Sequence, residues 1–159
     1  MRSIRPKVFE TNSSSCHVIT FSSEYVGPQA EPVQLTILGD GDYGWSCSTD
    51  SDDSTLRTPE EKLDYAIVAL GLYCNDPDER KSALDEIRRV FSLNNVEVEF
   101  DDCFGEEYDH DTVGYIDHQS APGSSEDCTE LANMALNDPE ALYNFVFGDA
   151  TVLVDNDNH

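Results

Sequence analysis

The distribution of charge restricts this chain more than any other feature, because excess like charge repels itself and opposes a compact state. The last basic residue is Arg89, and residues 95–159 contain 17 Asp and Glu with no Lys or Arg. The 159 residues carry 9 basic against 33 acidic side chains, a formal net charge of −24. Solubility of a small domain needs a magnitude of only about 2–8. We therefore expect the field to serve recognition of a positively charged surface or of cations.

Composition predicts one folded domain over residues 1–159, with acidic loops at about 40–55 and 101–111. Apolar clusters recur along the chain, and 7 Phe, 7 Tyr and 1 Trp are spread through it, unlike a disordered acidic tail. The five cysteines form no C-x-x-C pair, which predicts reduced thiols and no zinc ribbon. No apolar signal region or membrane span is recognisable, so we expect a cytoplasmic protein, in a host cell if the chain is of phage origin.

The hydrophobic pattern predicts an α+β fold, a mixed or antiparallel sheet with about three to four helices on one face. Extended segments are expected at residues 7–9 and 17–21, around a polar turn at 10–15, and loop structure is expected from residue 46 to residue 55. Helices are expected after the caps Thr58, Asp76 and Asp138, each followed by a proline, and over residues 126–136. Further strands are expected at residues 33–38, 96–100, 113–116 and 150–154.

Three polar segments lie beside expected strand ends: residues 9–17 (FETNSSSCH), residues 114–120 (GYIDHQS) and residues 154–158 (VDNDN). Together they resemble a group of uncharacterised phage and prophage proteins that share FETNSSS-x-H near the start, DHQS mid-chain and a terminal NDN. The resemblance covers about 20 of the residues, and Cys16 stands where the group has Thr or another small residue. It implies a phage-type origin and an α+β domain, and it implies no activity.

The same segments contain the residue types of a nucleophile–base–carboxylate set. Such an enzyme, a hydrolase of a nucleotide or phosphoester, would draw on Ser14, Ser15, His17, Asp117 and His118, with Asp157. No Gly-x-Ser-x-Gly elbow is present, and adjacent strand residues such as Cys16 and His17 point to opposite faces. The alternative interpretation is a hydroxyl-rich turn whose side chains bond to the backbone, and it is favoured.

The sequence contains none of the usual motifs for binding a metal ion or a nucleotide. The histidines His17, His110 and His118 have no zinc-site spacing, and the segment from Asp40 lacks the glycine and glutamate positions of an EF-hand loop. There is no Walker A or Gly-x-Gly-x-x-Gly loop, and clustered Lys and Arg for phosphate neutralisation are absent. We expect no cofactor, no dedicated metal site and no direct binding of nucleic acid.

The sequence favours instead a protein that imitates nucleic acid. Carboxylates spaced along a surface could occupy the basic groove of a nucleic-acid-binding host protein, such as a CRISPR effector or a restriction enzyme, and block it. An accessory or structural phage protein, with acidity that serves only solubility, remains the third interpretation. The expected partner-binding residues come from the acidic stretches: Asp40, Asp42, Asp52, Asp53, Glu97, Glu99, Asp101, Asp102, Glu106, Glu107 and Asp109.

Overall fold

Three helices begin at a proline behind a capping side chain, as predicted. The computed structural model describes residues 14–21, 24–39, 42–43, 53–101, 115–116 and 124–157. Helix α1 (Pro59–Tyr73) starts with a capping box, in which Glu61 N donates to Thr58 Oγ1 and Thr58 N donates to the Glu61 carboxylate. Satisfying these backbone groups fixes where the helix begins.

Two further helices use an aspartate in the same way. Helix α2 (Pro77–Leu93) follows Asp76, whose carboxylate accepts hydrogen bonds from the first turn. Helix α4 (Pro139–Phe147) follows Asp138, whose carboxylate accepts from Ala141 N. The remaining helix, α3 (Ser124–Asn137), is three residues longer than the predicted 126–136.

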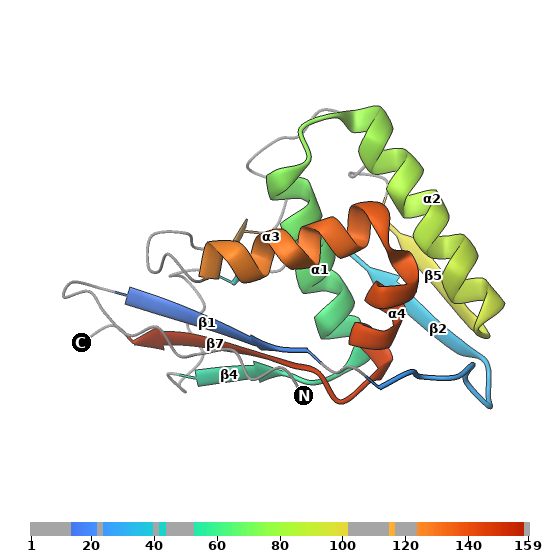
Figure 1. Cartoon of the computed structure of the whole chain (residues 1–159), viewed down its shortest axis with the longest axis horizontal. Helices are drawn as coiled ribbons and strands as arrows, with labels where there is room; N and C mark the ends of the chain where they lie inside the picture. The colour runs from blue at the N-terminus through green and yellow to red at the C-terminus, as the bar shows by residue number, and fades with distance from the viewer. Residues whose placement is uncertain are drawn as a thin grey trace.

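Helix α1 forms the centre of the core. Its residues 65–71 are all buried, which is the pattern of a helix covered on every side rather than a surface helix. Helix α3 crosses α1, and α4 and α2 complete the helical layer (Figure 1). Phe91 of α2 meets Tyr143 of α4 edge to face at 5.3 Å, so aromatic packing joins these two helices.

A three-stranded antiparallel sheet, ordered β1–β7–β4, lies at one end of the molecule (Figure 1). Its strands are β1 (Ser14–Thr20), β7 (Thr151–Asp157) and β4 (Asp53–Leu56). The row Ile19, Val152 and Leu56 is buried, and these residues are direct register partners across the three strands. This face of the sheet therefore packs on the core.

Strands β2 (Val33–Ile37) and β5 (Val96–Phe100) form a separate parallel pair at the other end. Their connection contains α1 and α2, since parallel strands need a crossover rather than a hairpin. At the end of β2, Gly39 adopts φ 64°, a conformation that favours glycine, and its N–H donates to Asp64 Oδ1 at 2.7 Å. The chain thus turns from β2 while staying fixed to α1.

The α+β class is confirmed, and strand pairing is both antiparallel and parallel. The strands are divided among small sheets, however, where one sheet was predicted. The third of these is a short parallel pair, β3 (Asp42–Tyr43) with β6 (Tyr115–Ile116). The predicted loop is wrong at residues 53–55, which belong to β4, and the predicted turn is wrong at Ser14 and Ser15, which belong to β1. Within the described ranges, no helix is both long and apolar enough to cross a membrane.

Candidate partner-binding surface

Two of the three polar segments are brought together by strand pairing. In the β1–β7 register Ser14 lies opposite Asp157, Ser15 opposite Asn156 and Cys16 opposite Asp155. Residues directly opposite in an antiparallel pair have Cβ atoms about 4.5–5.5 Å apart. Residues 14–17 of the first segment and 154–157 of the third are therefore one continuous patch of sheet, although most of the chain separates them.

The same register divides this patch between two faces, because successive strand residues alternate. His17 and Ser15 are two and four residues from buried Ile19, so they belong to the core-side face together with Asn156. Cys16 and its partner Asp155 belong to the opposite face.

Of the predicted catalytic set, the register places His17 opposite Val154 in β7. Asp157 shares the outer face with Asp155, two residues away, and Ser14 lies opposite Asp157. Asp117 and His118, the other members of that set, fall outside the described residues.

Strand β4 adds a third member to the Cys16–Asp155 row. Asp53 is the register partner of Asp155, so two like charges are placed directly across from one another. Like charges in this position are destabilising. A bound cation such as Ca²⁺ would relieve the repulsion between these two carboxylates. Ca²⁺ takes about six to eight oxygen ligands, however, and two aspartates supply too few. Among the residues that the structure describes, no group of three or more His, Cys, Asp or Glu is arranged to hold a metal.

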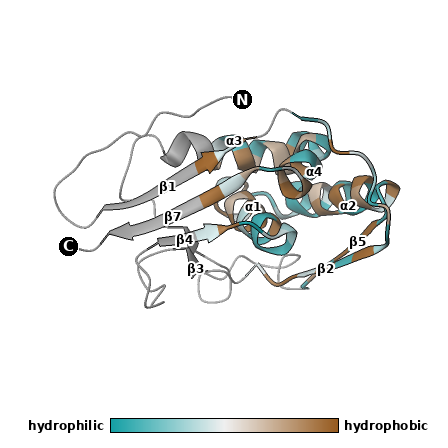
Figure 2. Ribbon diagram, turned by 90° about the horizontal axis from the view of Figure 1, so that it is seen from below, coloured by the Kyte–Doolittle hydropathy of each residue, from teal (hydrophilic) through white to brown (hydrophobic). Residues whose placement is uncertain are grey.

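The outer face of the β2–β5 sheet is an acidic surface. Burial alternates along both strands, and Glu97 and Glu99 are exposed while their neighbours in β5 are buried. In the parallel register Glu97 lies beside Gln34 and Glu99 beside Thr36, so the facing strand supplies no positive charge. The two strands run along the rim of the molecule, and α2 packs against β5 (Figure 2).

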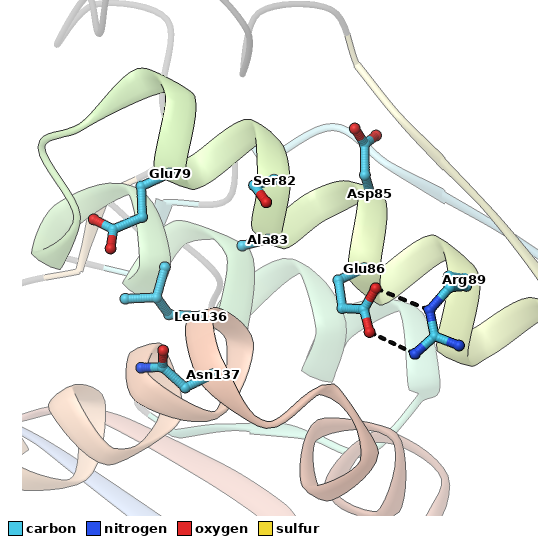
Figure 3. A pocket seen from close by; sticks show the side chains of 8 residues that line it. All are labelled: Glu79, Ser82, Ala83, Asp85, Glu86, Arg89, Leu136 and Asn137. Carbon is cyan, nitrogen blue, oxygen red and sulfur yellow. Dashed lines mark hydrogen bonds and ion pairs between the residues drawn. The ribbon is translucent and has the colours of Figure 1, made fainter.

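A second acidic surface is a concavity between α2 and the end of α3 (Figure 3). It has a volume of about 510 Å³, and its lining includes Glu79, Ser82 and Glu86 from α2 and Asn137 from α3. Glu86 is bonded to Arg89 within the same helix, so part of this charge is neutralised internally. Sequence analysis did not identify this surface. The periodic apolar face of α2 indicated which side is exposed, but not which other helix would border it.

Two of the six basic residues in the described chain are withdrawn from the surface. Lys62 is 2% exposed, and its Nζ donates to the carbonyl oxygens of Gly148 at 2.9 Å and Ala150 at 3.1 Å. Arg80 is 5% exposed and donates to the Cys74 carbonyl at 2.8 Å. Both cations are thus withdrawn from the surface and bonded to the backbone.

Arg88 and Arg89 pair with Asp85 and Glu86, one turn earlier in α2. Many carboxylates nevertheless face solvent. The exposed ones in the described chain are Glu24, Glu31, Glu60, Glu61, Asp76, Asp78, Glu79, Asp85, Glu86, Glu97, Glu99, Asp101, Glu130, Asp138, Glu140 and Asp149.

Local surroundings shift the pKa of several groups. Burial lowers the pKa of the Lys62 ammonium, and the nearby Asp149 carboxylate opposes that effect. Partial burial raises the pKa of Glu61, but the hydrogen bonds it accepts at the helix cap outweigh this and lower it overall. Burial also raises the pKa of the Cys74 thiol, which makes this cysteine a weak nucleophile.

The structure places only part of the predicted binding surface. Glu97, Glu99 and Asp101 are exposed at β5, while Asp42 and Asp53 lie in β3 and β4. Asp101 continues the β2–β5 ladder, because its N–H donates to the Ile37 carbonyl at 3.0 Å. The other predicted binding residues lie outside the described chain: Asp40, Asp52, Asp102, Glu106, Glu107 and Asp109.

Comparison of the chain with known protein families, with curated proteins and with solved structures finds no match.

Proposed function

We propose that this protein binds a basic nucleic-acid-binding protein and occupies the surface on which nucleic acid would lie. The observation that carries the proposal is the placement of charge: exposed carboxylates cover the described elements, whereas Lys62 and Arg80 are buried against backbone carbonyls. In the described chain the exposed carboxylates therefore far outnumber the exposed basic residues, which are Arg57, Lys81 and Arg89. A nucleic acid presents charge to its partner in the same way.

The net charge of −24 should make binding to a basic partner fast and sensitive to salt. Long-range attraction raises association rates with an oppositely charged partner, and salt weakens it. A phage-type protein acting in the cytoplasm of its host would find suitable targets among defence nucleases, such as CRISPR effectors and restriction enzymes. Blocking one of these requires stoichiometric binding and no covalent chemistry.

Stoichiometric binding needs no catalytic group, unlike the hydrolase alternative. In that alternative His17 would act as the base, and its register partner in β7 is Val154. A general base must reach its proton within hydrogen-bond distance or through one water. We therefore expect Ser14→Ala and His17→Ala to leave partner binding unchanged.

The first test is capture of partners from a bacterial lysate on immobilised protein at low and high salt, with identification by mass spectrometry. The expected result is one basic nucleic-acid enzyme that is lost at high salt. The purified enzyme is then titrated with this protein while its binding to labelled DNA or guide RNA is followed. Loss of nucleic-acid binding at about one equivalent supports the proposal.

Two results would contradict it. A captured enzyme that binds its nucleic acid equally well when saturated with this protein would exclude mimicry. Lysates of hosts that carry such defence enzymes, yet yield no salt-sensitive partner, would exclude the decoy function in those hosts. A variant with Glu97, Glu99, Asp101 and Asp102 neutralised together is expected to capture less of this enzyme than the natural chain does.

A further inference from the structure

The β2–β5 sheet holds its carboxylates in a straight row on a rigid support. Glu97 and Glu99 are two residues apart on one face of β5, a spacing of about 6.6 Å along a strand. The ladder bond from Asp101 N to the Ile37 carbonyl extends this alternation, so Asp101 is the third residue of the row. The other face of the strand is buried, with Val98 8% and Phe100 5% exposed, which fixes the sheet on the core.

The outer face is also hollowed. A depression of about 470 Å³ is lined by Pro32, Val33, Gln34, Glu97, Val98 and Glu99. Two carboxylates and one side-chain amide therefore border a space large enough to receive a side chain from another molecule. The Ser92 hydroxyl bonds to Glu97 Oε1 at 3.1 Å and holds that carboxylate in place. In the described chain no helix covers this face (Figure 2).

We propose that this face binds an extended segment of the partner that carries Lys or Arg at alternate positions, with successive basic side chains over Glu97 and Glu99. The choice of a basic occupant rests on the proposed function. A second copy of this chain is a poor occupant, because it would bring the same carboxylates against each other, and like charges directly opposite are destabilising.

An extended occupant fits the row better than a helix. In an extended chain every second side chain lies on one face, and the repeat of about 6.6 Å equals that of Glu97, Glu99 and Asp101. In a helix of 3.6 residues per turn, side chains four apart rotate by about 40° at each step. The third charge of a helical row would therefore turn away from Asp101.

The test uses two short fluorescent peptides of the same composition. In one, lysine alternates with threonine; in the other, all lysines precede all threonines. Affinity for the full chain is measured by fluorescence anisotropy at low ionic strength. We expect the alternating peptide to bind more tightly, because only its spacing matches the carboxylate row.

The test variant carries Glu97→Gln and Glu99→Gln. The control variant carries Glu60→Gln and Glu130→Gln, which remove the same charge from exposed sites in α1 and α3. The first pair should weaken binding of the alternating peptide by about three- to tenfold, since two exposed ion pairs are lost. The control pair should change it by less than about twofold. Circular dichroism checks that both variants are folded.

Equal weakening by both pairs of substitutions would overturn the proposal, because net charge alone would then explain binding. Equal affinity for the two peptides would also overturn it. The proposed function is judged separately by partner capture. If the variant with Glu97→Gln and Glu99→Gln captures a salt-sensitive nuclease as well as the natural chain does, the proposed binding surface is wrong, while the proposed function stands. If the peptide result holds and no target loses its nucleic acid, the function is wrong while the surface stands.

Discussion

Lys62 donates a hydrogen bond from its buried Nζ to the carbonyl oxygen of Gly148, the residue that ends α4, at 2.9 Å. The same ammonium reaches Ala150, immediately before β7 begins. One side chain of α1 therefore anchors the junction between the last helix and the last strand. A positive charge near a helix C-terminus also interacts favourably with the helix dipole.

Replacing Lys62 with methionine should destabilise the fold, because the carbonyls of Gly148 and Ala150 would lose a buried donor. The expected cost is about 1–3 kcal/mol in the free energy of unfolding, measured by urea denaturation. Lys81→Met, at an exposed position of α2, is the control and should stay within about 0.5 kcal/mol. Equal effects of the two substitutions would show that the Lys62 contacts contribute nothing.

Raising the pH should increase the stability of the natural chain relative to that of Lys62→Met. Burial lowers the pKa of Lys62 in the folded state, so the unfolded chain holds this proton to higher pH. Stability then rises with pH between the lowered folded pKa and the unfolded value of about 10.4. Urea titrations of both proteins from neutral pH to about pH 10.4 should show the free-energy difference growing in favour of lysine. A difference that shrinks over this interval would contradict the direction of the shift.

Salt should raise the melting temperature. The net charge of −24 opposes compaction, and raising NaCl from about 0.01 M to about 1 M shortens the Debye length from about 30 Å to about 3 Å. We expect a monotonic rise in differential scanning fluorimetry. The Glu97→Gln with Glu99→Gln variant should show a smaller rise, because it begins with less repulsion. A melting temperature that falls with NaCl would mean that internal ion pairs outweigh the repulsion.

Asp53→Asn should stabilise the protein. Asp53 and Asp155 are register partners in adjacent strands, and removing one of two like charges in this position is worth about 0.2–1 kcal/mol. Asp155→Asn should give a similar gain, and the double variant should gain less than the sum of the two. This double-mutant cycle is measured by urea denaturation at neutral pH. Additive gains would show that the two carboxylates do not interact.

Local signals in the sequence predict the helices well. Thr58, Asp76 and Asp138, each followed by proline, mark the helix starts correctly because capping depends on neighbouring residues alone. Strand β5 is also predicted to the residue, since its strict alternation of Val or Phe with Glu has no helical equivalent. In these elements local preference and tertiary structure agree.

Pairing between distant segments is what the sequence does not reveal. Strand β4 has the composition of a loop, with Asp53 and Ser54, and it becomes a strand because β7 supplies its hydrogen-bonding partner. The division into several small sheets likewise depends on which distant strands meet. The surface formed by Glu97 and Glu99 was predicted as exposed charge, but its neighbours Gln34 and Thr36 became known only from the β2–β5 register.

The position of β7 in its sheet has a consequence for synthesis of the protein on the ribosome. It is the middle strand of β1–β7–β4, yet it follows both of its neighbours in the chain. While the chain is being made, β1 and β4 leave the exit tunnel with their hydrogen-bonding groups unmatched, and β7 emerges last of the three. The sheet therefore cannot form before β7 has emerged, and the nascent chain must remain dispersed until then. Its many carboxylates, which keep neighbouring chains apart, protect the open strand edges over that interval.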